Sequence, residues 1–175
     1  MGVGNINEPN IVYAKKIPNK KGYINKYVLS KFDSIQDIEL FFEKSDQGEW
    51  PRSFMSEDYH PVNWDNYVIN ATARNLPEIL QRDPNEDVLL YISKDDCEHC
   101  KQFDPIYERA AKWLREKQPN VKIVLAKIDG GKNEVPDFNV KRFPEFLAYL
   151  SGGNKTTYMH VAFPRNYDDF ISHLI

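Results

Sequence analysis

The chain has 175 residues, of which 41% are hydrophobic, 13% aromatic and 28% charged, and its formal net charge is -3. This composition is typical of a folded globular protein and excludes an intrinsically disordered chain. Because the net charge is small and no basic stripe is present, we expect no nucleic-acid binding. No apolar run approaches the roughly 20 residues that span a bilayer, so we expect no membrane insertion.

Residues 1–58 carry the pattern of two strands followed by a helix. Residues 11–15 and 23–29 are the predicted strands, and a helix is predicted to begin at Ser34, where hydrophobic residues start to recur at helical spacing. Two strands and one helix cannot bury a core alone, so we interpret this segment as the second half of a truncated domain. Residues 59–66 are predicted to form an ordered connector.

Strands and helices alternate from residue 67 onward. A predicted strand at residues 68–71 leads to a helix, whose start we expect to be capped by Asn75 and Glu78. Residues 87–93 are almost continuously apolar, as in a central strand that is covered on both faces.

Residues 97–117 form a predicted helix with one buried face, and residues 121–128 form a parallel strand after it. A short helix is predicted at residues 133–138. Residues 145–150 and 156–161 flank a Ser-Gly-Gly-Asn turn, which indicates an antiparallel pair. With a last helix from about residue 166, the pattern predicts an α/β domain with a mixed sheet of about five strands flanked by helices.

Cys97 and Cys100 are the two cysteines of the chain, and they lie at the junction of a predicted strand and helix. A helix N-terminus stabilises a thiolate, so Cys97 is the predicted nucleophile. Cys100 lies one turn later, where it can attack a mixed disulfide and release the substrate. The spacing therefore favours thiol–disulfide exchange.

Zinc binding and a purely structural disulfide are the alternatives for this pair. Tetrahedral zinc needs two more ligands, and no second cysteine pair exists, so we expect no metal. A disulfide that closes so short a loop adds little stability, so a structural bridge is also disfavoured.

Three longer motifs occur in this domain. They are Cys-Glu-His-Cys-Lys-Gln-Phe at residues 97–103 with Pro105 following, Ala-Lys-Ile-Asp at residues 126–129, and Arg-Phe-Pro at residues 142–144. With them, residues 67–175 resemble a catalytic thioredoxin-like domain of the protein disulfide isomerase family. The resemblance implies a thioredoxin-like fold and a protein disulfide isomerase-type enzyme.

The resemblance extends to the N-terminal segment and implies partners and a location. Residues 1–58 resemble the C-terminal half of the non-catalytic thioredoxin-like domain that precedes the last catalytic domain of the family. The implied partners are unfolded or misfolded disulfide-containing proteins and the rest of a longer parent protein. The Cys97–Cys100 disulfide is the implied redox group, with no further cofactor and with glutathione or a protein oxidant as electron partner. The implied location is the endoplasmic reticulum lumen, although we expect neither a signal peptide nor a retrieval signal in this chain.

Further site residues follow from the resemblance. Phe143, Pro144 and Glu145 are implied to bind substrate, with Pro144 as a cis-proline that faces the disulfide. His99, Lys127 and Arg165 are implied to assist catalysis, with Arg165 lowering the pKa of Cys100. The residues alone leave open a trans Pro144, a solvated Arg165 and a purely structural Lys127.

The chain departs from the family pattern around the cysteines. Carboxylates are predicted to surround Cys97 in place of the usual residues: Asp95, Asp96, Glu98 and Glu145. Like charges disfavour another anion, so we expect a raised Cys97 pKa, opposed by the helix dipole and protonated His99. Tyr91 stands where the family has a buried glutamate, so we expect slow deprotonation of Cys100. The predicted enzyme is more reducing and slower than is typical, and the alternative is a redox-weak chaperone or scaffold module.

Overall fold

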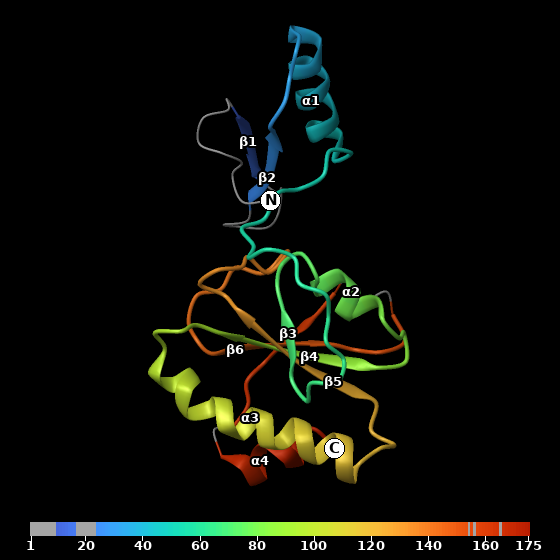
Figure 1. The fold of residues 1–175 in the computed structure, drawn as a ribbon, viewed down its shortest axis with the longest axis vertical. Coiled ribbons are helices and arrows are strands. Elements are labelled where there is room, and N and C mark those ends of the chain that lie inside the picture. The colour runs from blue at the N-terminus through green and yellow to red at the C-terminus, as the bar shows by residue number, and fades with distance from the viewer. Residues whose placement is uncertain (1–9, 17–23, 154, 156, 165) are drawn as a thin grey trace.

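The computed structural model describes residues 10–16, 24–153, 155, 157–164 and 166–175. These residues form a small N-terminal part and a larger part built around a five-stranded sheet (Figure 1). The N-terminal part consists of β1 (Ile11–Lys16), β2 (Ile24–Leu29) and α1 (Ile35–Gln47), and its two strands pair antiparallel.

Helix α1 begins where the sequence predicts. The Ser34 hydroxyl accepts a hydrogen bond from the Asp37 amide at 3.2 Å, and the Asp37 carboxylate accepts one from the Ser34 amide at 3.0 Å. This reciprocal capping satisfies backbone donors that the first turn leaves free. The helix packs Phe41 onto Tyr27 and Leu29, which together form a small core.

The larger part contains all the remaining elements. In chain order they are β3 (Ile69–Ala71), α2 (Leu76–Gln81), β4 (Asp87–Ser93), α3 (Glu98–Lys117), β5 (Ile123–Asp129), β6 (Glu145–Tyr149), β7 (Met159–Val161) and α4 (Tyr167–Ser172). The strand order is β3-β5-β4-β6-β7. β3, β5 and β4 run parallel, whereas β6 pairs antiparallel with both β4 and β7. The predicted mixed sheet of five strands is confirmed.

Strand β4 lies at the centre of the sheet and contributes side chains to two hydrophobic cores, one on each face. Leu90 and Ile92 belong to the core on the α2 side, while Leu89 and Tyr91 pack against α3 and α4 on the opposite face. Figure 1 shows α3 and α4 together along one face and α2 on the other. This two-sided burial explains why the strand is apolar at almost every position.

The predicted helix at residues 133–138 is wrong, because these residues form loop and turn. The Asn133 side chain, which is 1% exposed, accepts hydrogen bonds from the amides of Ala73 and Glu57, each at 3.1 Å. The Glu134 amide donates to the Met55 carbonyl at 2.8 Å instead of to a helical partner. These contacts with distant segments hold the chain in a non-helical path.

The predicted cap at Asn75 is also wrong in its geometry. Asn75 precedes α2, but its side chain makes no cap hydrogen bond to the helix. Its amide oxygen instead accepts from the Thr72 amide at 2.7 Å, and its amide nitrogen donates to the His60 carbonyl at 3.2 Å. Because Asn75 is buried, it serves the loop backbone around it rather than the helix end.

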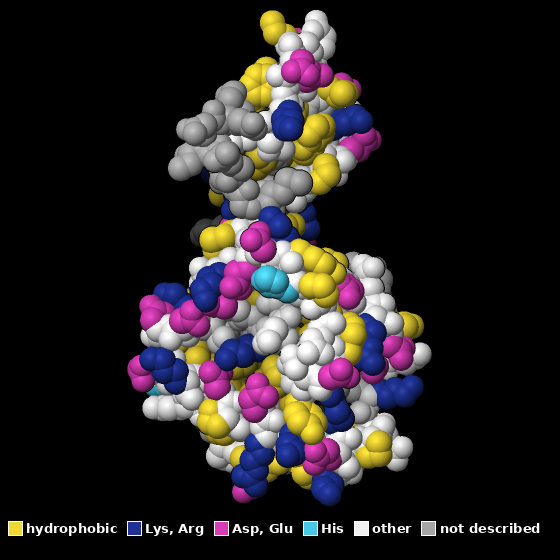
Figure 2. All heavy atoms as spheres, viewed as in Figure 1, with side chains coloured by type: hydrophobic (Ala, Val, Ile, Leu, Met, Phe, Trp, Pro, Cys, Tyr) yellow, Lys and Arg dark blue, Asp and Glu magenta, His cyan; other side chains and the backbone are white. Residues whose placement is uncertain are grey.

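Charged side chains join the two parts of the molecule. Arg52 donates to both carboxylate oxygens of Asp137, at 2.9 and 3.3 Å, and Lys26 pairs with Glu134. On the face shown in Figure 2, basic and acidic side chains are interspersed rather than gathered by sign. None of the helices in the described part of the chain is long and apolar enough to cross a membrane. The assignment of residues 1–58 to half of another domain stays a prediction.

Candidate active site around the Cys97–Cys100 disulfide

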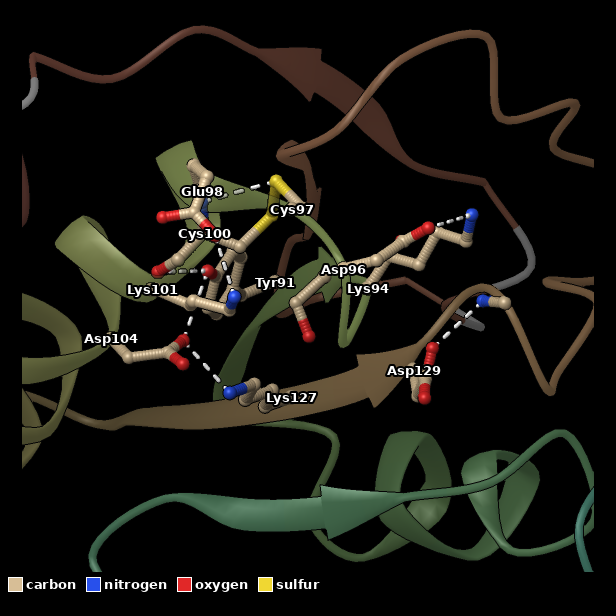
Figure 3. The surroundings of a disulfide bond; sticks show 12 residues. Tyr91, Lys94, Asp96, Cys97, Glu98, Cys100, Lys101, Asp104, Lys127 and Asp129 are labelled. Atoms are coloured by element: carbon tan, nitrogen blue, oxygen red, sulfur yellow. Dashed lines mark hydrogen bonds and ion pairs between the residues drawn. A yellow bond between two sulfur atoms is a disulfide. The ribbon is translucent and has the colours of Figure 1, made fainter.

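Cys97 and Cys100 form a disulfide at the N-terminus of α3, with Cα atoms 5.2 Å apart. Strand β4 ends at Ser93, and a short turn brings the chain to Cys97, the N-cap residue (Figure 3). The Cys97 sulfur accepts a hydrogen bond from the Cys100 amide at 3.1 Å. Cys97 is partly exposed, whereas Cys100 is 1% exposed. A substrate can therefore reach Cys97 but not Cys100.

The helix end favours a negative charge on the Cys97 sulfur. The backbone amides of the first turn have no intrahelical partner, and the Cys100 amide already points at this sulfur. In the reduced state the same amide and the helix dipole stabilise a thiolate there. The geometry thus assigns different roles to the two cysteines, a reactive outer one and a buried inner one.

The acidic residues around Cys97 all have cationic partners. Asp95, Asp96 and Glu98 are exposed, and each forms an ion pair of 3.0 Å or less: Asp95 with Lys132, Asp96 with Lys94, and Glu98 with Lys101. The Lys132 hydrogen bond lowers the pKa of Asp95, and bonds to Asp95 and Asp129 raise the pKa of Lys132. These lysines offset much of the negative charge from which the sequence predicts a raised Cys97 pKa.

Glu145 is also compensated, and it is buried. It opens β6 with 5% exposure, and its carboxylate pairs with the Arg142 guanidinium at 3.3 Å and with the His160 ring. A buried carboxylate without partners is costly, so the contacts with the Arg142 guanidinium and the His160 ring are what allow this acid to lie inside the fold. Glu145 therefore contributes less free negative charge than the sequence pattern suggests.

The peptide bond between Phe143 and Pro144 is cis, as the resemblance implies. Pro144 and Glu145 line a cavity of about 240 Å³ together with His99 and Phe103 of α3. Phe143 and Cys97 pack against the same hydrophobic core. The structure thus brings the predicted substrate-binding residues beside the first turns of α3, and exposed His99 lies at the edge of this cavity.

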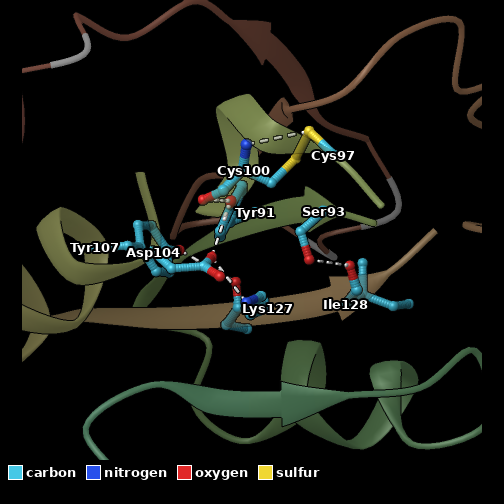
Figure 4. A network of polar contacts seen from close by, with 9 residues as sticks. Tyr91, Ser93, Cys97, Cys100, Asp104, Tyr107, Lys127 and Ile128 are labelled. Carbon is cyan, nitrogen blue, oxygen red and sulfur yellow. Dashed lines mark hydrogen bonds and ion pairs between the residues drawn. A yellow bond between two sulfur atoms is a disulfide. The ribbon is translucent and has the colours of Figure 1, made fainter. Parts of the chain in front are cut away.

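A carboxylate that sequence reasoning missed lies behind the disulfide. Asp104, one turn after Cys100 on α3, accepts hydrogen bonds from Lys127 at 2.8 Å and from the Tyr91 hydroxyl at 3.0 Å (Figure 4). The signal in the sequence is the spacing of four between Cys100 and Asp104, which places both on one side of a helix. Lys127 therefore keeps a carboxylate partner, although Tyr91 has replaced the glutamate on β4.

Arg165 lies outside the described residues. Among the described residues, no group of three or more histidine, cysteine, aspartate or glutamate side chains is arranged to hold a metal ion.

Comparisons with known proteins agree with this geometry. The family model described as Thioredoxin matches residues 67–173. Protein disulfide-isomerase of Drosophila melanogaster is 28% identical over 141 residues, which cover 81% of this chain and 27% of that protein. Protein disulfide-isomerase A3 of Gallus gallus is 33% identical over 138 residues, which cover 78% of this chain and 26% of that protein.

A solved structure shows the same fold. The first thioredoxin domain of mouse protein disulfide-isomerase A4 matches with a TM-score of 0.52 and 25% identity, covering 67% of this chain and 79% of that one. The chain spans about a quarter of the length of the two curated relatives named above. The predicted thioredoxin-like fold and the predicted resemblance are both confirmed. The chain belongs to the thioredoxin family, and the relatives that it resembles are protein disulfide-isomerases.

Proposed function

We propose that this chain is a protein disulfide isomerase-type thiol–disulfide oxidoreductase that acts on disulfides of protein substrates. The observation that carries the proposal is the disulfide between an accessible N-cap Cys97 and a buried Cys100 one helical turn later. Exchange chemistry needs one thiol that meets the substrate and a second that resolves the intermediate. This arrangement supplies both.

In the reducing direction, the Cys97 thiolate attacks one sulfur of a substrate disulfide. A Cys97–substrate disulfide forms, and the other substrate sulfur leaves as a thiolate that takes up a proton. Cys100 then loses its proton and attacks the Cys97 sulfur, which releases the second substrate thiol. Two electrons pass from the Cys97–Cys100 dithiol to the substrate, and the chain ends as the disulfide. The reverse sequence oxidises a substrate dithiol.

The substrate side of the site is the cavity beside Phe143, Pro144 and Glu145. An unfolded polypeptide offers an extended backbone and apolar side chains, and this cavity combines aromatic walls with polar groups from His99 and His160. A segment seated there would hold its disulfide close to the first turn of α3. Unfolded or misfolded disulfide-containing proteins are therefore the proposed substrates.

The proposed setting follows from the relatives. Several are named protein disulfide-isomerases, and the chain matches only part of their length. We place this chain in a longer multidomain protein of the endoplasmic reticulum lumen, whose other domains contribute to substrate binding. Glutathione or a protein oxidant is the proposed electron partner that returns the pair to its starting state.

The test is reduction of a disulfide-bonded protein such as insulin by the intact chain with glutathione as reductant. We expect Cys97→Ser to abolish the activity above background, because the thiol that remains, Cys100, is buried. Cys100→Ser keeps the nucleophile but cannot resolve the intermediate, so we expect it to accumulate a covalent complex with substrate that a thiol reagent releases. If Cys97→Ser leaves the rate unchanged, the domain acts instead as a redox-weak chaperone or scaffold module.

A further inference from the structure

Asp104 is a charged side chain close to the buried cysteine that the exchange steps above do not use. It lies four residues after Cys100 on α3, and helical side chains lean toward the N-terminus, so its carboxylate lies over the turn that contains Cys100. The Lys127 amino group reaches it from β5 at 2.8 Å, and the Tyr91 hydroxyl from β4 at 3.0 Å. Three elements therefore converge on one carboxylate.

The Tyr91 hydroxyl connects this carboxylate to Cys100. It lies 3.2 Å from the Cys100 carbonyl oxygen as well as 3.0 Å from Asp104 (Figures 3 and 4). Burial and the nearby Asp104 charge raise the pKa of Tyr91 far above its usual value, so the hydroxyl stays neutral and acts as a donor. The Tyr91 hydroxyl thus links Cys100 to the charged pair of Asp104 and Lys127.

The sign of each charge determines its effect on the cysteines. Reduction of the disulfide adds two electrons and produces sulfur atoms that are neutral thiols or negative thiolates. A positive charge nearby stabilises a thiolate and hence the reduced form, whereas a negative charge does the opposite. Lys127 and Asp104 therefore act in opposite directions on the same equilibrium, and partial burial lessens their screening by water.

We propose that Asp104 is a positioning residue that makes the Cys97–Cys100 pair more reducing by cancelling the charge of Lys127. The proposal deepens the proposed function, since it concerns the redox equilibrium of the same disulfide. In this chain, the carboxylate that holds Lys127 is on the helix that carries the cysteines rather than on the strand behind them. Its charge therefore acts on the buried Cys100 from one turn away.

Other titratable groups face this cluster and limit the size of the effect. Glu108, one turn further along α3, interacts electrostatically with both Lys127 and Asp104. Asp95, in the turn before Cys97, also interacts electrostatically with Lys127, and Tyr107 does so with Tyr91. If Asp104 is neutralised, Glu108 and Asp95 still offset part of the Lys127 charge. We therefore expect a moderate shift rather than a large one.

The test measures the equilibrium between the Cys97–Cys100 pair and a glutathione redox buffer at pH 7, using the intact chain. We expect Asp104→Asn to favour the reduced form about threefold to tenfold, because Lys127 is then uncompensated; tenfold corresponds to about 30 mV. Lys127→Gln is expected to shift the equilibrium in the opposite direction. The double variant is expected to return close to the unmodified chain.

Two controls separate charge from damage to the fold. Asp104→Glu keeps the charge and is expected to stay within about twofold of the original equilibrium. Glu116→Gln removes an exposed carboxylate near the far end of α3 and is expected to have no effect. The proposal is overturned if Asp104→Asn and Lys127→Gln shift the equilibrium in the same direction, or if both leave it unchanged. If Asp104→Asn does not fold, the Lys127→Gln variant tests the proposal alone. A shift toward the oxidised form supports the proposal, and a shift toward the reduced form overturns it.

The equilibrium with glutathione does not depend on any protein substrate. One outcome is that the chain fails to reduce insulin while Asp104→Asn and Lys127→Gln still shift the glutathione equilibrium in the two expected directions. That result contradicts the proposed function and leaves the role of Asp104 intact. A chain that reduces insulin but shows no shifts contradicts the role of Asp104 alone.

Discussion

Lysine side chains surround the reactive end of α3. Lys94, Lys101 and Lys132 each bind one of the exposed carboxylates next to Cys97, so the local charge is close to balanced. Such surface pairs add little to the stability of the fold. Their effect on a thiolate can nevertheless be measured, because the pKa of a thiol responds to small changes in local charge.

Removal of one of these lysines is expected to make the charge near Cys97 more negative and so to change the pKa of its thiol. In Lys132→Gln the Asp95 carboxylate loses its partner, and we expect the pKa of reduced Cys97 to rise by about half a unit at low salt. The measurement is the pH dependence of alkylation of Cys97. In a matched control, Asp95→Asn is expected to lower the same pKa. High salt should reduce both shifts, and a pKa that falls in Lys132→Gln contradicts this account.

Residue-scale features were predictable from sequence to very different degrees. The roles of Cys97 and Cys100 follow from their spacing at a strand–helix junction, and the cis bond before Pro144 follows from the family motif. The lysine partners were not predictable, because Lys132 meets Asp95 only when the loop after β5 folds back toward the start of α3. Asp104 was missed because its two partners come from two other strands.

At the scale of elements, α3 is fixed to the sheet by polar as well as apolar contacts. The buried Tyr107 hydroxyl lies 2.7 Å from the Leu89 carbonyl oxygen and 3.1 Å from that of Ala126, which joins the helix to β4 and β5. Phe103 and Tyr107 also pack around the Tyr91 ring. The helix that carries the cysteines therefore has a fixed position on the central strands.

Glu108 makes the stability of this helix packing depend on pH. Although Glu108 is exposed, partial desolvation by its neighbours raises its folded-state pKa above the ordinary value of 4.5, so the folded chain holds this proton more tightly than the unfolded chain does. The associated stability is present in full below about pH 4.5 and is lost as the pH rises through the folded-state pKa. We expect Glu108→Gln to unfold like the unmodified chain at pH 4 and to be more stable at pH 7, by at most about 0.5 kcal/mol.

Urea unfolding at the two pH values provides the measurement. Glu116→Gln, at an exposed position on the same helix, serves as the control and is expected to show no such difference. Equal stability of Glu108→Gln and the unmodified chain at pH 7 would mean that Lys127 fully compensates the partial desolvation of the Glu108 carboxylate.

The elements themselves were largely predictable from local sequence patterns. The central strand follows from its continuous apolar run, the long helix from its hydrophobic spacing, and the antiparallel pair at the end from the turn between its strands. The segment at residues 133–138 was not predictable, since its path depends on contacts with Glu57, just before the connector, and with the loop after β3. A hydrophobic pattern indicates which face of a helix or strand is buried. It does not reveal that a polar side chain such as Asn133 binds the backbone of a distant segment.

At the scale of the whole molecule, Asn133 joins three separate segments. Its oxygen accepts from the amides of Glu57 and Ala73, and its nitrogen donates to the Glu57 carboxylate at 2.8 Å and to the Asp129 carbonyl at 3.1 Å. The segment just before the connector, the loop after β3 and the end of β5 thus meet at one side chain. Removal of a buried partner leaves backbone groups without hydrogen bonds, which is costly.

Asn133→Ala is therefore expected to lower the free energy of unfolding by about 2–3 kcal/mol. Urea denaturation followed by circular dichroism measures this loss. Asn139→Ala, at an exposed position in the same loop, is the control and should change the stability by less than about 0.5 kcal/mol. A loss below about 1 kcal/mol in Asn133→Ala would contradict the central role of this side chain.

The order of the strands has a consequence for synthesis of the chain. β4 is bordered by β5 and β6, and both are translated after Cys97 and Cys100. While the polypeptide grows from its N-terminus, the two thiols therefore emerge from the ribosome before the strands that complete the sheet behind them. During that interval Cys100 lacks the strands on both sides of β4 that complete the sheet behind it, and we expect both thiols to be open to pairing with other thiols nearby. The distinction between a reactive outer sulfur and a protected inner one arises only after Tyr149 has been added.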